Sequence, residues 1–169
     1  FYFVGEHSST IRALVLRLIF GNPVPKLRAA VHRFIKQALT LPPSDPLSAR
    51  GYAAVPQRDM CDFPMIRGKH CLLRGGVNAS DDELCELPTE FLQRSFAAAG
   101  MPWGVPKYIA TDSDVSEFTG FTTYDFKEYP KRTQGHLFVD MLLLLQASFF
   151  IGNPASTVSS NVLVAREAQ

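Results

Sequence analysis

Cysteine is scarce in this chain of 169 residues, which holds only Cys61, Cys71 and Cys85. Three thiols are too few for a small scaffold held together by several disulfides. Nine and thirteen residues separate them, unlike the closely paired ligands of a structural zinc site. Two states stay open at this point: one disulfide with a free thiol, or three reduced thiols.

Long apolar runs and an excess of charge of one sign are also missing. The longest apolar run, Met141–Leu145, is soon interrupted by Gln146 and Ser148 and is far too short to span a bilayer. The chain has seventeen basic and sixteen acidic side chains, for a formal net charge of +1. This near balance argues against nucleic acid or an anionic membrane as partner. The chain begins at Phe1 without a signal peptide, and we interpret it as a fragment of a longer protein.

The motifs of the commonest nucleotide and metal sites are absent as well. Neither Gly-x-Gly-x-x-Gly nor the P-loop pattern occurs, which argues against a dinucleotide-dependent dehydrogenase and a P-loop NTPase. The four histidines are scattered, and no His-x3-His or Cys-x2-Cys spacing supports a metal site. We therefore expect no metal and no other cofactor.

What is present is the pattern of an α/β domain. Apolar residues at helical spacing alternate with short apolar runs bounded by glycine and proline, which predicts a Rossmann-like parallel sheet flanked by helices. We divide the chain into a helical lead-in and linker, residues 1–46, and a Rossmann-like domain, residues 47–169, packed as one compact unit. The predicted helices cover residues 11–19, 26–39, 88–99, 137–147 and about 157–165, and the predicted strands cover residues 51–55, 107–111, 122–126 and 149–152.

Some of these elements carry sharper expectations. The strand 51–55 should stop at Pro56, because proline cannot donate to a central ladder. Residues 57–80 read as one long loop that presents the N-glycosylation sequon Asn78-Ala79-Ser80 at the surface. The strand 149–152 should be fully buried. The inward side chains of helix 88–99 are predicted to be Leu92, Phe96 and Ala99.

Polar residues follow the predicted strands where a parallel sheet places its ligands, beyond the carboxyl ends. After Gly152, small hydroxyl residues meet a helix start, where backbone N–H groups suit a phosphate, although a plain helix cap explains the same residues. Arg58 would clamp a diphosphate or lie on the surface, and Asp112 would accept from a ribose or base or cap the next helix. Asp140 stands alone among apolar neighbours and needs a partner, either a ligand's base edge or a backbone amide.

In this order, these segments resemble the GDP-fucose protein O-fucosyltransferase family and its fucosyltransferase relatives. The most specific part is Val139–Val158, which reads Val-Asp-Met-Leu-Leu-Leu-Leu-Gln-Ala-Ser-Phe-Phe-Ile-Gly-Asn-Pro-Ala-Ser-Thr-Val and is followed by Arg166-Glu167. It is similar to the family's donor-binding stretch. Tyr108–Ser113 is similar to a strand end of the family, and Gly51–Asp59 occupies the place of its His-x-Arg strand end. The resemblance covers roughly residues 50–167.

The resemblance implies one half of a GT-B type glycosyltransferase, acting on a protein or glycan hydroxyl with inversion and without metal. This chain would hold the GDP-fucose donor, and a missing amino-terminal domain would supply much of the acceptor groove, in the lumen of the endoplasmic reticulum or Golgi. Arg58 would be the catalytic residue that neutralises the departing β-phosphate. The implied donor-binding residues are Asp112, Asp140, Ser156, Thr157 and Val158.

Two departures from the family pattern support an alternative. Pro56-Gln57-Arg58 stands where the family has His-x-Arg, and Val158 stands where it usually has phenylalanine. The alternative is a non-catalytic Rossmann-like domain that binds GDP or a protein partner without transfer. A third interpretation is an unrelated α/β domain whose serine and threonine turn only caps a helix.

Overall fold

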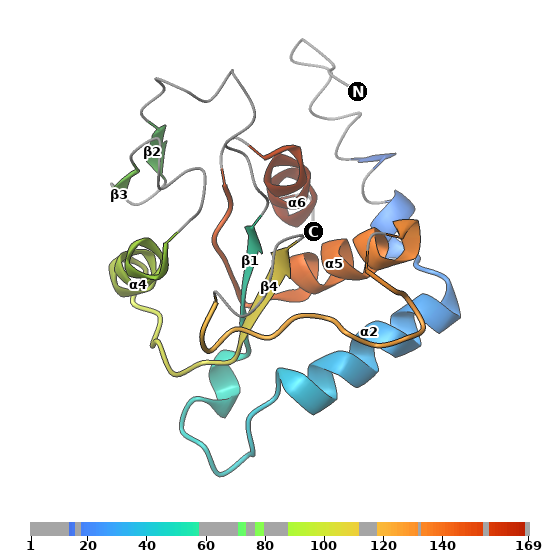
Figure 1. Cartoon of the computed structure of the whole chain (residues 1–169), viewed down its shortest axis with the longest axis horizontal. Coiled ribbons are helices and arrows are strands. Elements are labelled where there is room, and N and C mark those ends of the chain that lie inside the picture. Colours follow the sequence, from blue (N-terminus) through green and yellow to red (C-terminus); the bar gives the residue numbers. More distant parts are fainter. Residues whose placement is uncertain are drawn as a thin grey trace.

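A parallel sheet between helices is the centre of the computed structural model, which describes residues 14–15, 18–57, 71–73, 77–79, 88–111, 118–131, 133–153 and 156–167. The sheet has the strand order β4-β1-β5, and β2 and β3 form a separate antiparallel pair. This confirms the predicted α/β class (Figure 1). The strands are β1 (Ala53–Gln57), β2 (Cys71–Leu73), β3 (Val77–Ala79), β4 (Lys107–Thr111) and β5 (Phe149–Phe150), and the helices are α2 (Pro25–Ala38), α4 (Thr89–Ala98), α5 (Gln134–Gln146) and α6 (Thr157–Glu167).

Helices cover both faces of the sheet because its side chains alternate between two apolar layers. Ala54 and Tyr108 belong to the cluster that includes residues of α2, α5 and α6, whereas Ala53 and Ile109 belong to the cluster that includes α4. Figure 1 shows α2 and α5 on one side of β1 and β4, with α4 on the other. A strand buried on both faces is typical of parallel sheets, and the period of two explains the division.

Helix α2 begins with Pro25 in its first turn, where a missing N–H costs nothing, and matches the predicted helix 26–39 closely. The ring of Phe34 packs on Tyr108, Tyr124 and Phe126, with centroid distances of 5.9, 5.3 and 5.5 Å. The predicted lead-in therefore contributes side chains to the core of the sheet. Its buried residues are Leu27, Ala30, Val31 and Phe34.

The predicted helix ahead of α2 is seen at residues 14–15 and 18–21, which are helical. Residues 11–13 and 16–17 lie outside the described part of the chain. The ring of Phe20 contacts that of Phe138 at 5.8 Å. The apolar residues that predicted this helix are nevertheless exposed: Leu14, Val15, Leu18 and Ile19.

Helix α4 ends as its sequence predicts, at a glycine. Gly100 has a φ of +64°, its N–H bonds Ala97 O at 3.0 Å, and the N–H of Met101 bonds Phe96 O at 2.9 Å. This is a Schellman ending, which needs the left-handed conformation that glycine adopts freely. Leu92 and Phe96 are buried as predicted, but Ala99 is exposed, and Phe91 is the third buried side chain. The prediction for Ala99 was wrong because the helix has already ended there.

Strand β1 continues through Pro56, contrary to the prediction that it would stop there. Pro56 pairs in register with Ala110 of β4, whereas β5 pairs only with Ala53 and Ala54. The N–H of Ile151 bonds Ala54 O at 3.1 Å, so the backbone N–H and C=O groups of the even-numbered residues of β1 point toward β5. Proline has no N–H to donate on that side, and β5 has already ended, so no ladder bond is lost.

Three other predictions about strands were wrong in extent. Residues 57–80 are not one loop, because β2 and β3 pair antiparallel within it and Asn78 of the sequon lies in β3 opposite Leu72. The predicted strand 122–126 is reduced to a bridge between Tyr108 and Thr122. β5 has two residues, both partly exposed, and full burial begins only at Ile151. Segments this short carry too few residues for a clear period.

Helix α5 begins three residues earlier than predicted, because the Thr133 side chain caps it by accepting from His136 N at 3.2 Å. At its other end, the hydroxyl of Tyr52 donates to Leu143 O at 2.6 Å. Arg166 Nη1 lies 3.2, 3.0 and 2.6 Å from the carbonyl oxygens of Leu144, Leu145 and Ala147. Tyr52 and Arg166 together satisfy carbonyls that a helix end leaves without partners. The arginine of the Arg166-Glu167 pair thus joins α6 to α5.

Candidate functional site

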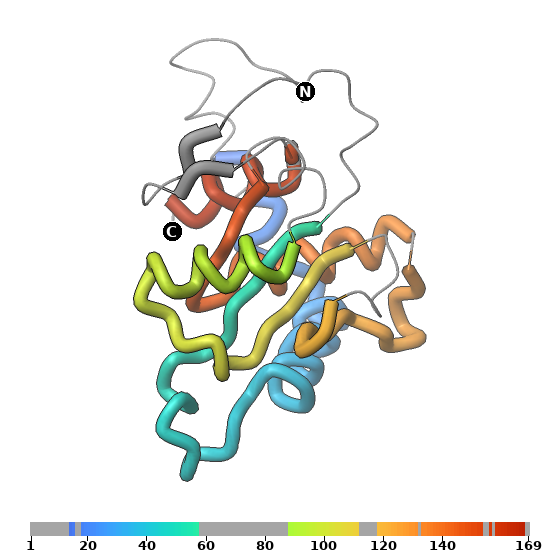
Figure 2. The backbone as a smooth tube through the Cα atoms, turned by 60° about the vertical axis from the view of Figure 1, so that its left-hand side comes forward, coloured from blue at the N-terminus to red at the C-terminus, as the bar shows by residue number. Residues whose placement is uncertain are grey.

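The strand order makes β1 the strand at which the connections change faces, so that a topological switch point lies between β1 and β5. After β1 the chain passes to α4 on one face of the sheet, whereas after its neighbours β4 and β5 the chain passes to α5 and α6 in the opposite layer. Adjacent strands whose connections leave to opposite faces open a crevice at their carboxyl ends, where ligands of doubly wound folds bind. Figure 2 shows β1 and β4 running side by side toward the same end of the molecule.

The turn between β5 and α6 is held by its own small side chains. Ser159 Oγ accepts from the backbone N–H of Asn153 at 2.9 Å, and Ser156 Oγ accepts from the N–H of Ser159 at 3.4 Å. All three residues are buried, with exposures of 1% for Asn153, 5% for Ser156 and 0% for Ser159. Ser156 therefore acts as the N-cap of α6, and its hydroxyl already has a donor within the turn.

The first amides of α6 lie at a helix start, where an external acceptor can bind. In any α-helix the first N–H groups have no intrahelical partner, and the cap by Ser156 uses only that of Ser159. The N–H groups of Thr157 and Val158 come next to the positive end of the helix dipole. This arrangement suits a phosphate group without a lysine. Val158 is partly buried, and the side chain of Thr157 lies outside the described atoms.

The other predicted contacts follow the paired ends of two strands. Gln57 and Thr111 are register partners and the last residues of β1 and β4, and both are buried. Arg58 and Asp112 come next in the sequence but lie outside the described residues. Their assignments remain predictions.

Asp140 is buried at 4% exposure and has two partners from its own chain. Its Oδ1 accepts from the Tyr108 hydroxyl at 2.5 Å, and its Oδ2 lies 3.2 Å from His136 Nδ1. The sequence suggested two other partners for Asp140, the base edge of a ligand and a backbone amide. The spacing of four residues between His136 and Asp140 was a signal for the first contact, because such residues share a helix face. Nothing local pointed to Tyr108.

The two partners of Asp140 have displaced pKa values. Burial, and next the charge of Asp140, raises the pKa of Tyr108 well above its usual range, so the hydroxyl keeps its proton. The hydrogen bond to Asp140 raises the pKa of His136, against an opposing effect of burial. Asp140 thus favours the protonated form of both neighbours.

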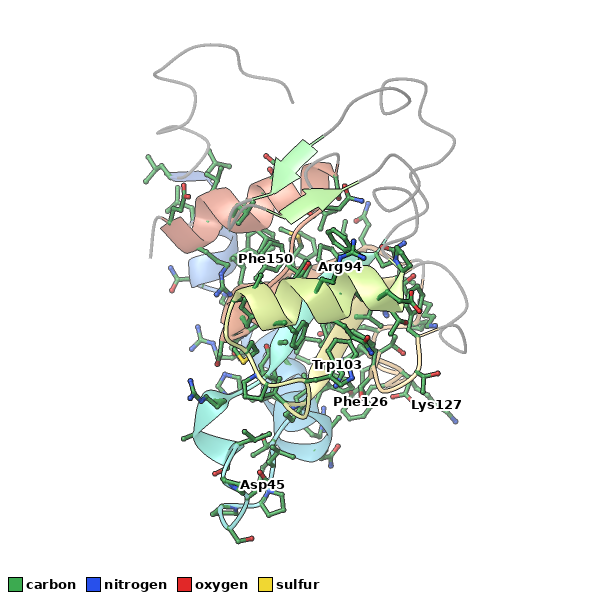
Figure 3. All side chains as sticks on the ribbon, turned by 90° about the vertical axis from the view of Figure 1, so that its left-hand side faces the viewer. Asp45, Arg94, Trp103, Phe126, Lys127 and Phe150 are labelled. Atoms are coloured by element: carbon green, nitrogen blue, oxygen red, sulfur yellow. The ribbon has the colours of Figure 1, made fainter. Side chains whose placement is uncertain are left out.

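A second polar group in the interior, Lys107, lies at the start of β4, at the opposite end of the strand from Thr111. Its Nζ donates to Trp103 O at 2.6 Å and lies 4.5 Å from the centroid of the Trp103 ring. Burial lowers the pKa of Lys107. Figure 3 shows Trp103 beside α4, and the Phe96 ring meets it edge-on at 4.9 Å. The contacts of Lys107 are structural.

Among the described residues, no group of three or more His, Cys, Asp or Glu side chains is placed to hold a metal ion. No helix in the described ranges is both long and apolar enough to cross a bilayer.

Comparison with known proteins finds similarity in structure alone. No protein-family profile and no curated protein sequence matches the chain. A crystal structure of POFUT1, a GDP-fucose protein O-fucosyltransferase, in complex with GDP superposes with a TM-score of 0.53 at 15% identity, over 85% of this chain and 44% of that one. Its complex with GDP-fucose gives 0.52 at 16% identity, over 85% and 43%. The chain therefore has a fucosyltransferase-like fold and spans less than half the length of these structures.

Proposed function

We propose that this chain is the donor-binding part of a fucosyltransferase-like glycosyltransferase and holds GDP-fucose at the switch point between β1 and β5. The observation that carries the proposal is that α6 begins just after β5, beyond the carboxyl ends of the strands, so its first amides would face an anion bound there. The diphosphate would accept from the N–H groups of Thr157 and Val158, in the field of the helix dipole. Structures with this fold contain GDP and GDP-fucose, which supports the same ligand class.

The other predicted donor contacts take different roles in this proposal. Ser156 would shape the turn, because its hydroxyl already caps α6. Asp112 would contact the ribose or base from the end of β4. Asp140 would read guanine only by exchanging Tyr108 or His136 for the base edge, since each of its oxygens already has one of these partners.

The proposed reaction is inverting transfer of fucose to a protein or glycan hydroxyl, without a metal ion. Arg58 would neutralise the β-phosphate as the bond to the sugar breaks, an electrostatic role that does not require the protein to form a covalent bond. A missing amino-terminal domain would supply the acceptor groove, and the reaction would take place in the lumen of the secretory pathway.

Calorimetric titration of the purified chain tests donor binding. We expect GDP and GDP-fucose to bind, UDP and ADP to bind at least tenfold more weakly, and magnesium to make no difference. The reason is that the helix amides serve any diphosphate, whereas the base contacts select guanine. Equal affinity for all three diphosphates would remove guanine from the proposal, and no protection by GDP against thermal unfolding would favour the unrelated-domain interpretation.

Thr157→Pro tests the helix amides directly. Proline is tolerated at the first position of a helix, so the variant should fold while losing one N–H. We expect GDP affinity to fall by about 10- to 100-fold, as for the loss of a hydrogen bond to a charged group. Thr157→Ala is the matched control, because it keeps the N–H and removes the hydroxyl. Titration of both variants with GDP measures the difference, and equal affinities would place the phosphate elsewhere.

A non-catalytic GDP-binding domain is the second candidate. Pro56 lies within β1, and by the resemblance it stands where the family has a histidine, so that contact would be missing from this strand end. Under this candidate, GDP would bind as proposed and the natural full-length polypeptide would release no GDP from GDP-fucose.

A further inference from the structure

A buried group of three ionisable side chains connects α5 to two other elements. His136, Asp140 and Tyr108 have exposures of 7%, 4% and 0%. Asp140 lies between the other two, at 2.5 Å from the Tyr108 hydroxyl of β4 and 3.2 Å from His136 Nδ1. His136 also reaches the segment that precedes α5, because its Nε2 lies 3.2 Å from Tyr124 O. One imidazole thus bonds on both sides.

Both ring nitrogens of His136 face acceptors. A backbone carbonyl only accepts, so Nε2 must carry a hydrogen to bond Tyr124 O. A carboxylate also only accepts, so Nδ1 must carry a second hydrogen to bond Asp140. When Asp140 is a carboxylate, both contacts exist together only in the imidazolium form. A neutral imidazole loses one of them and leaves a buried acceptor without its donor.

Other charged and titratable groups near His136 contribute less than Asp140. Lys131 opposes the imidazolium charge, and so does the position of His136 in the first turn of α5, near the positive end of the helix dipole. The Tyr124 ring meets the imidazole edge-on at 5.8 Å. Its hydroxyl lies 3.5 Å from Glu128, which also pairs with Arg33 of α2 at 2.6 Å. The net effect raises the pKa of His136, and the bond to Asp140 is its largest cause.

The elements joined here lie beside one another in the core. Tyr108 is in the middle of β4, where Thr122 bridges to it, and Tyr124 follows two residues later. The segment 118–131 has one short bridge to the sheet, so its position depends on side-chain contacts. The rings of Phe34 and His136 supply two of them to Tyr124.

We propose that charged His136 holds the segment 118–131 against α5 and β4, and that the segment is released when the imidazole loses its proton as pH rises. When the imidazole is neutral, either the contact to Tyr124 O or the contact to Asp140 is lost or weakened. Either change loosens the connection between the segment and α5. This inference needs no ligand, so it stands or fails separately from nucleotide binding.

The sign follows from the raised pKa of His136. Folding is favoured by the extra proton affinity, and this stabilisation is complete below the unfolded value of about 6.5 and is lost as pH rises through the folded pKa. The unfolding constant should therefore rise by up to about tenfold per pH unit in a window that opens at about pH 6.5.

Urea unfolding of the whole chain between pH 5.5 and pH 8.5 tests this. We expect the unfolding constant of His136→Gln and of Asp140→Asn no longer to rise with pH, because each substitution removes one member of the charged pair. His32→Gln is the matched control, an exposed histidine of α2 whose removal should leave the rise intact. A rise that persists in His136→Gln overturns the proposal.

Two measurements on the unaltered chain keep the test independent of whether the variants fold. The imidazole of His136, followed by NMR, should titrate above pH 6.5, and a midpoint at or below this value overturns the proposal. Hydrogen exchange, corrected for the intrinsic rate, should show that the amides of Ile109 and Thr122 lose protection between pH 6 and pH 8. These amides bond Thr122 O at 2.9 Å and Lys107 O at 2.8 Å. Unchanged protection at both sites would mean that nothing is released.

Discussion

Phe34→Ala is expected to lower the free energy of unfolding by about 4 kcal/mol, within the range for removing a buried phenylalanine. Phe34 is 1% exposed and its ring packs on Tyr108, Tyr124 and Phe126. Truncation leaves a cavity between α2, the sheet and the segment 118–131, and these rigid rings cannot fill it without moving. Because a whole domain is stable by only about 5–15 kcal/mol, the loss is a large fraction of the total.

Urea unfolding measures this loss, and His32→Ala is its control on the same helix. His32 is exposed, so its truncation should change stability by less than about 0.5 kcal/mol. The comparison also tests the predicted boundary between residues 1–46 and 47–169. If Phe34→Ala unfolds no earlier than His32→Ala, α2 is a separable lead-in; if it unfolds much earlier, α2 belongs to the core of the domain.

The elements with strong local patterns were predictable from the sequence. β4 has the predicted bounds, 107–111, because its apolar run lies between a proline and a polar stretch. α2, and α5 apart from its first three residues, matched because their apolar residues extend over three or more turns. In each case the information is contained within the element itself.

The errors arose where the answer depends on another segment. Pro56 was predicted to end β1 on the assumption of a strand paired along both edges, but the extent of β5 is a tertiary property. The apolar face of residues 14–15 and 18–19 indicated a helix correctly, yet it could not tell what that face would meet. β2, β3 and the bridge at Thr122 are too short to leave a periodic signal.

The candidate site divides in the same way. The turn after Gly152 was identifiable because small hydroxyl residues before a helix indicate a cap, and Ser156 is that cap. Burial of Asp140 was also predictable from its apolar neighbours. Its contact with Tyr108 was not, because it depends on how α5 crosses β4. The switch point could not be predicted, because it depends on the order of the strands in the sheet, and local sequence patterns do not reveal that order.

Arg58→Ala is expected to reduce the rate of fucose transfer by about 100- to 1000-fold, the usual cost of removing one preorganised donor at a developing charge. Arg58 follows Gln57, the last residue of β1, in the sequence, and the leaving diphosphate of the proposed donor would lie beyond this strand end. Stability should change by less than about 0.5 kcal/mol, because replacing an arginine in a loop that follows a strand removes little apolar packing. The transfer rate of Arg58→Lys should lie between those of the unaltered protein and Arg58→Ala, since lysine keeps the charge but loses the planar fork of arginine.

Release of GDP from GDP-fucose by the natural full-length polypeptide measures the rate, and thermal unfolding of the same samples measures stability. Arg67→Ala is the control, because it removes an arginine from the same stretch of sequence without touching the predicted contact. A comparable loss with Arg67→Ala, or a loss of stability that parallels the loss of rate, would remove Arg58 from the reaction. If the unaltered polypeptide binds GDP but releases none from GDP-fucose, the result favours the second candidate, a nucleotide-binding domain without transfer.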